Sequence, residues 1–235
     1  MKPTFDANNT KVYDNILDQQ QFNKVFDFMN YVPMVHKRSH GEWNRVWGFG
    51  DGEILMANRY IWPRNKVREF REPEDCLIPF FKFVNKAIEE SGLWSEEEKN
   101  DITTVVMTPY IWPPGSGLSW HNDSNYLGAF TFYAHQYWSP EWGGEFLTCE
   151  ANDYILPDKK DVTWKVFDNQ PLYDVIMDAG VGHYIQPKPN RLVLNKGGSK
   201  GILHKVNRST VNANARITLQ GFIRAKGIED DCCSE

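Results

Sequence analysis

The run Trp120-His121-Asn122-Asp123 is the most informative stretch of the sequence. In an extended segment, side chains two positions apart project from the same face, so the imidazole of His121 and the carboxylate of Asp123 can converge on one ion. A His-x-Asp triplet by itself is more often a surface turn or a satisfied pair than a metal site. Its meaning therefore depends on a third ligand from elsewhere in the chain.

We expect the third ligand to be His204, in the segment GILHKVN. Two histidines and one carboxylate occupy one face of an octahedral iron(II) and leave three positions open for chemistry. Asp123 also offsets part of the metal charge, which a neutral ligand set would not do. The sequence thus predicts a metal site formed by His121, Asp123 and His204.

The other histidines are weaker candidates for metal ligands. His36 and His40 lie in a polar stretch, where we expect them to be exposed. His135 follows a predicted strand and is an alternative ligand. His204 is followed 12 residues later by a predicted strand that begins with Arg216, whereas no strand with an arginine follows His183 at a similar distance. We therefore do not assign His183 to the site.

Helical patterns fill the first hundred residues, and strand patterns fill the rest. Apolar residues at three- and four-residue spacing predict helices over Asp18–Asn30 (through Phe22, Val25, Phe26 and Met29) and over Glu74–Ser91, which Ser91-Gly92 would end. Short runs between turn residues predict strands over Glu53–Ile61, Ile102–Met107, Ala129–Tyr133, Glu145–Thr148, Arg191–Leu194 and Ile217–Ile223. This order favours an α+β fold, in which helices back one sheet of a β-sandwich or barrel.

The last predicted strand has two different faces. Alternation along the strand puts Ile217 and Leu219 on one face and Arg216 and Thr218 on the other. The aliphatic face suits packing under a helix, whereas the face with Arg216 would look into a polar interior. A buried arginine needs an anion there.

Composition excludes several classes of protein. The chain has 235 residues, enough for one domain with a substantial core, and a formal net charge of −5, which disfavours a nucleic-acid binder. No apolar run is long enough for a membrane span or a signal peptide. The four cysteines (Cys76, Cys149, Cys232 and Cys233) lack the spacing of a zinc site and favour a reducing compartment. We therefore predict a cytoplasmic protein without nucleic-acid or membrane partners.

Five motifs occur in order along the second half of the chain: Tyr110-Ile-Trp-Pro-Pro-Gly-Ser-Gly, His121-Asn-Asp123, Trp142-Gly-Gly-Glu-Phe146, Asn190-Arg-Leu-Val-Leu194 before His204, and Arg216-Ile-Thr218. With these motifs, the span from about Thr104 to Arg224, about half of the chain, resembles the catalytic core of the prolyl 4-hydroxylase-like branch of the iron(II)/2-oxoglutarate-dependent dioxygenases. Gly143-Gly144, within one of the motifs, is also typical of a hairpin with positive backbone dihedrals.

The resemblance implies a double-stranded β-helix (jelly-roll) fold in one domain, residues 1–235. Residues 101–226 would form the catalytic core, residues 1–100 a mostly helical flank with the first strands, and residues 227–235 a polar tail. It implies that His121, Asp123 and His204 bind iron(II). It further implies that Arg216 holds the distal carboxylate of 2-oxoglutarate, with Thr218, Tyr133 and Tyr110 as further cosubstrate contacts.

The implied reaction is hydroxylation of an unactivated C–H bond in an amino-acid, peptidyl (prolyl included) or related substrate. Dioxygen is the cosubstrate, succinate and carbon dioxide are released, and ascorbate is a candidate reductant. Asp123 argues against the halogenating variants, which need that ligand position vacant for halide.

Two alternatives remain open at this point. The interval from His204 to Arg216 is longer than is usual in the family, so Arg191, Arg208 and Arg224 are alternative anion partners. The chain could also be a catalytically silent, cupin-like jelly-roll that binds a metal or a small ligand. Such a module would have no use for a cation on the inward face of the last strand.

Two further features bear on the substrate. Trp112 and Trp120 bracket the loop that leads into the metal ligands, and a groove lined by them would favour a polypeptide substrate. The basic segment Arg59–Arg71 is either a solvated loop or a lid that contacts an acidic substrate through Arg64 and Arg68.

Overall fold

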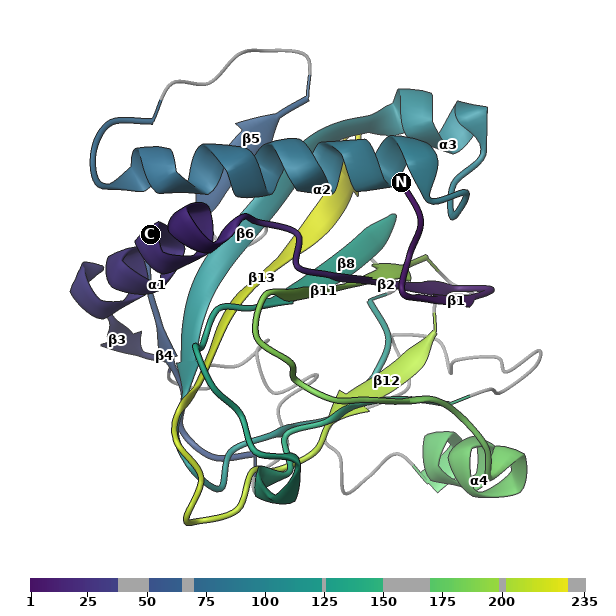
Figure 1. Cartoon of the computed structure of the whole chain (residues 1–235). Coiled ribbons are helices and arrows are strands. Elements are labelled where there is room, and N and C mark those ends of the chain that lie inside the picture. Colours follow the sequence, from purple (N-terminus) through teal and green to yellow (C-terminus); the bar gives the residue numbers. More distant parts are fainter. Residues whose placement is uncertain (38–50, 65–69, 124–125, 150–169, 199–201, 228–235) are drawn as a thin grey trace.

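The computed structural model describes residues 1–37, 51–64, 70–123, 126–149, 170–198 and 202–227. Helices lie mainly in the first hundred residues and strands mainly in the rest, as predicted (Figure 1). All pairings between the described strands are antiparallel, and the strands form two sheets. The structure therefore confirms the α+β class.

The larger sheet has nine strands in the order β1-β2-β11-β8-β13-β6-β4-β3, and β5 also pairs with β6. The longest pairing joins β6 to β13, which lies between β6 and β8. The bounds are β1 Phe5–Ala7, β2 Thr10–Asp14, β3 Val35–His36, β4 Leu55–Met56, β5 Tyr60–Pro63, β6 Ile102–Trp112, β8 Gly128–Tyr133, β11 Arg191–Lys196 and β13 Arg216–Ala225.

The smaller sheet has four strands in the order β10-β9-β12-β7. Its strands are β7 Leu118–His121, β9 Phe146–Cys149, β10 Tyr184–Ile185 and β12 Leu203–Val206. Because β12 lies between β9 and β7, β7 is an edge strand of this sheet as far as the described residues go.

Helices cover one face of the larger sheet. Helices α1 (Gln19–Tyr31) and α2 (Ile78–Glu90) lie across it, and α3 (Glu96–Asp101) leads into β6 (Figure 1). Their apolar side chains form one continuous core with those of the sheet, including Leu219 and Ile223 of β13. Helix α4 (Gln170–Ala179) instead packs against the smaller sheet. No helix among the described residues is both long and apolar enough to cross a membrane.

The apolar face of α1 differs in one residue from the prediction. Asp18 caps the helix, since its carboxylate accepts a hydrogen bond from the backbone N–H of Gln21 at 2.8 Å. Phe28, rather than Phe26, belongs to the buried face, and Phe26 is only half-buried. At about 100° per residue the face centres near Val25, so Phe26 falls on its edge.

The second predicted helix, Glu74–Ser91, forms in two parts. A 3₁₀ turn, η2 (Glu74–Leu77), precedes α2, and Gly92 follows the helix with a φ of +72°. A positive φ at this position is typical of a helix end, so Ser91-Gly92 is the stop that the sequence predicts. The buried residues of α2 are Phe80, Phe81, Val84, Ala87 and Ile88.

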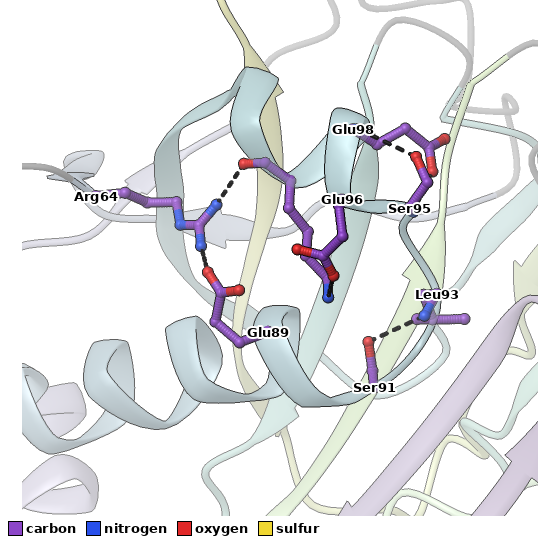
Figure 2. Close-up of polar contacts among 8 residues, drawn as sticks. Arg64, Glu89, Ser91, Leu93, Ser95, Glu96 and Glu98 are labelled. Atoms are coloured by element: carbon purple, nitrogen blue, oxygen red, sulfur yellow. Dashed lines mark hydrogen bonds and ion pairs between the residues drawn. The ribbon is translucent and has the colours of Figure 1, made fainter.

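Polar contacts hold α2 and α3 to the segment that follows β5. Figure 2 shows Arg64 donating to the carboxylate of Glu89 on α2 and to the backbone carbonyl of Lys99 on α3. Ser95 and Glu98 form a capping box at the start of α3. Arg64 therefore contacts the scaffold. Arg68 lies outside the described residues, so the choice between a solvated loop and a lid over Arg59–Arg71 stays a prediction.

The predicted strands from Ile102 onward all form at the expected positions, whereas two predictions for the first hundred residues were wrong. Glu53–Ile61 forms two short strands, β4 and β5, rather than one. The hairpin of β1 and β2 was not predicted, so the first hundred residues contribute more strands than expected. In β2, even Lys11 is buried, because β2 pairs with both β1 and β11. Distant residues cause this burial, so the local sequence of β2 does not alternate between apolar and polar residues and gives no strand signal.

Between the two sheets lies a second layer of buried side chains, which we call the inter-sheet layer. It includes Tyr133 from the larger sheet together with Phe146 and Val206 from the smaller sheet. Tyr110 and Trp112 of β6 form an adjoining cluster. Arg216 and Thr218 lie on the face of β13 opposite Ile217 and Leu219, as strand alternation predicts.

The ion pair of Asp14 with Arg191 gives a test of the fold. Asp14 accepts from Nε and Nη2 of Arg191 at 2.6 and 2.9 Å and from Lys188 at 3.0 Å. Burial raises the pKa of Asp14, but the two cations outweigh burial and hold the pKa below its ordinary value. The pair therefore stabilises the fold above the unfolded-state pKa, and this contribution is lost as pH falls through the folded-state pKa.

We expect Asp14→Asn to lower the free energy of unfolding at pH 7. The difference from the unsubstituted protein should shrink as pH falls below about 4, where the aspartate of the unfolded chain takes up its proton. Urea unfolding between pH 7 and pH 3 measures it. A difference that does not change with pH would contradict this account.

Candidate metal centre

His121, Asp123 and His204 form a three-residue cluster in the structure. His121 ends β7 and His204 lies on β12, directly opposite it in the antiparallel register. Nε2 of His204 is 3.3 Å and Nε2 of His121 is 4.0 Å from the carboxylate of Asp123. The potential ligand atoms all lie within 4.8 Å of one another. Among the described residues this is the one group of histidine, cysteine and acidic side chains with such geometry.

Both imidazoles are oriented by a backbone carbonyl two residues earlier. Nδ1 of His121 lies 2.7 Å from the carbonyl oxygen of Ser119, and Nδ1 of His204 lies 2.9 Å from that of Ile202. A carbonyl oxygen only accepts, so each Nδ1 donates a proton to its carbonyl, and Nε2 is the ring atom that faces Asp123 in both histidines. This is the arrangement that metal-binding histidines commonly have.

The electrostatics of the cluster favour a cation. Burial, together with the nearby His204, lowers the pKa of His121 to about 4, so its imidazole is neutral at pH 7. Burial tends to raise the pKa of Asp123, but the adjacent imidazoles outweigh it and hold the pKa below its ordinary value. Asp123 is therefore an anion. A neutral Nε2 donor beside a carboxylate is a chemically suitable donor set for a divalent metal.

The other histidines lie outside the cluster. His36 is exposed and 3.4 Å from Glu53, and His40 lies outside the described residues. His135 is buried, and its Nε2 donates to the carbonyl oxygen of Pro187 at 2.7 Å. His183 pairs through its backbone with Thr148 of β9. The structure thus groups His204, and not His135, with His121 and Asp123.

Arg216 opens β13 and is only 1% exposed. Its guanidinium lies 4.6 Å from the ring centre of Trp112, and its Nη1 donates to the carbonyl oxygen of Gly144 at 3.1 Å. Its Nη2 is buried and has no hydrogen-bond partner among the described residues. Burial lowers the pKa of Arg216 to about 10, so it is still a cation at pH 7.

Tyr133, Thr218 and Tyr110 form a row across the larger sheet. Thr218 of β13 is directly opposite Tyr133 of β8 and Tyr110 of β6, so the three side chains share one face. The hydroxyl of Thr218 accepts from Nε1 of Trp112 at 2.9 Å, and that of Tyr110 accepts from Lys37 at 3.3 Å. The hydroxyl of Tyr133 is buried and, like Nη2 of Arg216, lacks a partner among the described residues.

These two buried polar atoms fit an anion. Burial raises the pKa of Tyr133 to about 12, so its hydroxyl keeps its proton and can donate. The guanidinium of Arg216 also donates. The two groups are close enough for the charge of one to influence the pKa of the other. A carboxylate that accepts from both would satisfy donors that are costly to bury without a partner.

The three alternative arginines are less suited to this role. Arg191 is bound to Asp14 through two hydrogen bonds, and Arg208 is exposed. Arg224 stands eight residues along β13 from Arg216, which corresponds to roughly 27 Å of extended strand.

Trp120 does not line the inter-sheet layer, contrary to the prediction. It packs beside Cys149, Leu203 and residues of α4, with Lys205 lying 5.8 Å from its ring centre. The reason is strand alternation, because Trp120 precedes His121 on β7 and therefore points to the opposite face. Trp112 belongs to the cluster that adjoins the inter-sheet layer, and it lies beside Arg216.

Sequence reasoning missed Gly144 as a contact of Arg216. Gly143 and Gly144 have φ values of +71° and +76°, as the hairpin prediction requires. In addition, a Cβ on Gly144 would lie 2.9 Å from Nη1 of Arg216 and 3.0 Å from Trp138. The Gly-Gly pair is a sequence signal for a turn, but nothing in it indicates this approach to a distant arginine.

Comparison with known proteins gives matches in structure alone. Neither protein-family models nor curated proteins match the sequence. A prolyl-4-hydroxylase from Pseudomonas putida aligns over 94% of both chains, with a TM-score of 0.56 and 14% identity. A prolyl hydroxylase from Trichoplax adhaerens, in complex with a peptide fragment of the hypoxia inducible factor oxygen degradation domain, aligns over 93% of this chain and 84% of that one, with a TM-score of 0.57 and 14% identity.

A 2OG-Fe(II) oxygenase family oxidoreductase from Burkholderia pseudomallei has a TM-score of 0.51 and 13% identity over 91% of this chain and 84% of that one. At these identities the likeness concerns the fold. The chain thus has the fold of prolyl hydroxylases and 2OG-Fe(II) oxygenases over nearly its whole length.

The cluster of His121, Asp123 and His204 predicts metal-dependent stability. With Co(II) at a hundredfold excess over its Kd, we expect the melting temperature to rise by about 5–10 °C. His204→Gln should abolish the rise, because it removes one of the two imidazole donors. His36→Gln, which changes an exposed histidine outside the cluster, should keep it. Differential scanning fluorimetry measures all three proteins, and an equal rise in His204→Gln would contradict the assignment.

Proposed function

We propose that this protein is an iron(II)- and 2-oxoglutarate-dependent oxygenase that hydroxylates an unactivated C–H bond. One observation carries the proposal: a His-Asp-His cluster and a buried arginine with an unpartnered Nη2 occur in one fold. A site that only binds metal accounts for the cluster but not for the cost of burying Arg216. The fold likeness to 2OG-Fe(II) oxygenases supports the same function and a double-stranded β-helix for residues 101–226.

In this proposal His121, Asp123 and His204 hold iron(II). The two imidazoles donate through Nε2, whose lone pairs are set by the carbonyls of Ser119 and Ile202. Asp123 adds a negative charge. With three protein ligands, a bound iron(II) would still be able to bind the cosubstrate and dioxygen.

Arg216 holds the distal carboxylate of 2-oxoglutarate in the same proposal. A guanidinium binds a carboxylate through two parallel hydrogen bonds and stays charged when buried. Two contacts orient Arg216: its guanidinium lies over the ring of Trp112, and its Nη1 donates to the carbonyl oxygen of Gly144. Nη2 is then left for the ligand. The hydroxyl of Tyr133 donates to the same carboxylate, and Thr218 and Tyr110, in the same row, line the cosubstrate.

Bound iron(II) and 2-oxoglutarate would supply the oxidising chemistry, which consumes dioxygen and releases succinate and carbon dioxide. The protein's own contribution is position and a dry environment. Phe146 stacks on the ring of His204 with a centroid distance of 5.1 Å and fixes its plane. Both histidines of the cluster are buried, which suits chemistry that requires a dry site.

Likeness to the solved structures supports a proposal for the substrate class. Two of these proteins are prolyl hydroxylases, and one is bound to a peptide. We therefore propose an amino-acid, peptidyl or prolyl substrate, with ascorbate as the reductant that keeps the iron in its ferrous state. We also propose that the protein acts in the cytoplasm and has no nucleic-acid partner.

Anaerobic titration with iron(II) and 2-oxoglutarate, followed by measurement of succinate release, tests the function. The substrate panel should contain proline-containing peptides and free amino acids. We expect saturable binding of 2-oxoglutarate that depends on iron(II), and succinate release that a substrate stimulates. Metal binding without 2-oxoglutarate binding would instead favour a catalytically silent, cupin-like protein.

The role of Arg216 predicts a specific loss. We expect Arg216→Lys to raise the Kd for 2-oxoglutarate by at least about tenfold, because an ammonium cannot reproduce the bidentate contact. Tyr133→Phe should raise it by a smaller factor, through loss of one donor. Arg191→Lys makes the same chemical change at the arginine bound to Asp14 and should leave this Kd unchanged. Calorimetric titration in the presence of Mn(II) gives the three values, and equal effects of the two arginine variants would contradict the proposal.

A further inference from the structure

Asp51 is a buried carboxylate from outside the strand-rich half of the chain, and it contacts β7. It is 4% exposed. Its Oδ2 accepts from the backbone N–H of Ser119 at 3.1 Å, and its Oδ1 accepts from the hydroxyl of Ser119 at 2.8 Å. Both carboxylate oxygens therefore bind one residue, through charge-assisted hydrogen bonds.

The backbone around Asp51 is fixed by close packing against the segment before β7. The carbonyl oxygen of Asp51 accepts from the N–H of Gly117 at 2.9 Å. Gly52 has a φ of +83°, and a Cβ there would lie 3.1 Å from the Cβ of Ser116. Glycine permits both this backbone conformation and this close approach. The position of the Asp51 carboxylate is thus set by the main chain.

Ser119 is also the residue that orients His121, since its carbonyl oxygen accepts from Nδ1 of His121 at 2.7 Å. A continuous path of hydrogen bonds therefore runs from Asp51 through Ser119 to the imidazole. In this path Asp51 holds the N–H and hydroxyl of Ser119, and Ser119 holds the ring.

The two histidines differ in how their strands are supported. His204 lies on β12, which has β9 on one side and β7 on the other. His121 lies on β7, an edge strand whose one strand partner among the described residues is β12. On its other side, Asp51 accepts the outward N–H of Ser119, as a neighbouring strand would do.

We infer that Asp51 is a positioning residue for the metal ligand His121, acting through Ser119. This inference rests on the proposed function, because it concerns the metal site of that function. Removal of the Asp51 carboxylate frees the backbone of Ser119, and the imidazole of His121 then loses its fixed orientation. Partners of this kind typically change metal affinity by 10- to 100-fold.

The test compares Co(II) binding in Asp51→Asn, Ser119→Ala and Asp14→Asn, measured by anaerobic calorimetric titration of the full chain with Co(II) alone. We expect Asp51→Asn to raise the Kd by about tenfold or more. Ser119→Ala should raise it less, because it removes the hydroxyl contact and keeps the backbone one. The visible absorption spectrum of bound Co(II) should change in both variants, since it reports ligand orientation.

Asp14→Asn is the matched control. It makes the same chemical change at another hydrogen-bonded aspartate, which is half-buried, and should lower the melting temperature without changing the Co(II) Kd or spectrum. An unchanged Kd and spectrum in folded Asp51→Asn would overturn the inference. If Asp51→Asn does not fold, Ser119→Ala decides, and an unchanged Kd there overturns it. Failure of the unsubstituted protein to bind Co(II) would instead overturn the proposed function.

Discussion

The antiparallel register between β7 and β12 is the constraint on which the His-Asp-His cluster depends. It places His121 directly opposite His204, with ring centroids 4.2 Å apart. Side chains alternate along each strand, so a slip of one residue would turn one imidazole to the opposite face, where Trp120 now packs. Asp123 can complete the cluster only because this register already holds both rings on the inner side.

The larger sheet separates two kinds of chemistry. Helices α1 and α2 take its outer face and build the apolar core that stabilises the fold. The inner face is consequently available for polar groups such as Arg216, Thr218 and Tyr133, which are buried without belonging to that core. Burial of a cation and a phenol in this layer lowers stability unless a ligand joins them. The apolar core and the buried polar groups thus lie on opposite sides of the same strands.

Sequence predicted the parts of this arrangement that are local or strongly patterned. The triplet around Asn122 and the alternation after Arg216 needed only the geometry of a strand, and the helix over residues 78–90 needed only its apolar period. Other features depend on contacts between distant segments. The burial of β2, the outward orientation of Trp120 and the contact of Asp51 with Ser119 arise from sheet pairing and packing that no short window contains.

The bond from Arg216 to Gly144 links the two sheets, since one residue begins β13 and the other directly precedes Glu145 and β9. The acceptor in this bond is a main-chain oxygen, which no substitution can remove. A substitution can, however, fill the space beside this oxygen, because the Cβ of any residue larger than glycine at position 144 would clash with the guanidinium of Arg216. The spacing of the two sheets therefore acts together with the ring of Trp112 to fix where the positive charge stands. A shift of one sheet against the other would move this charge.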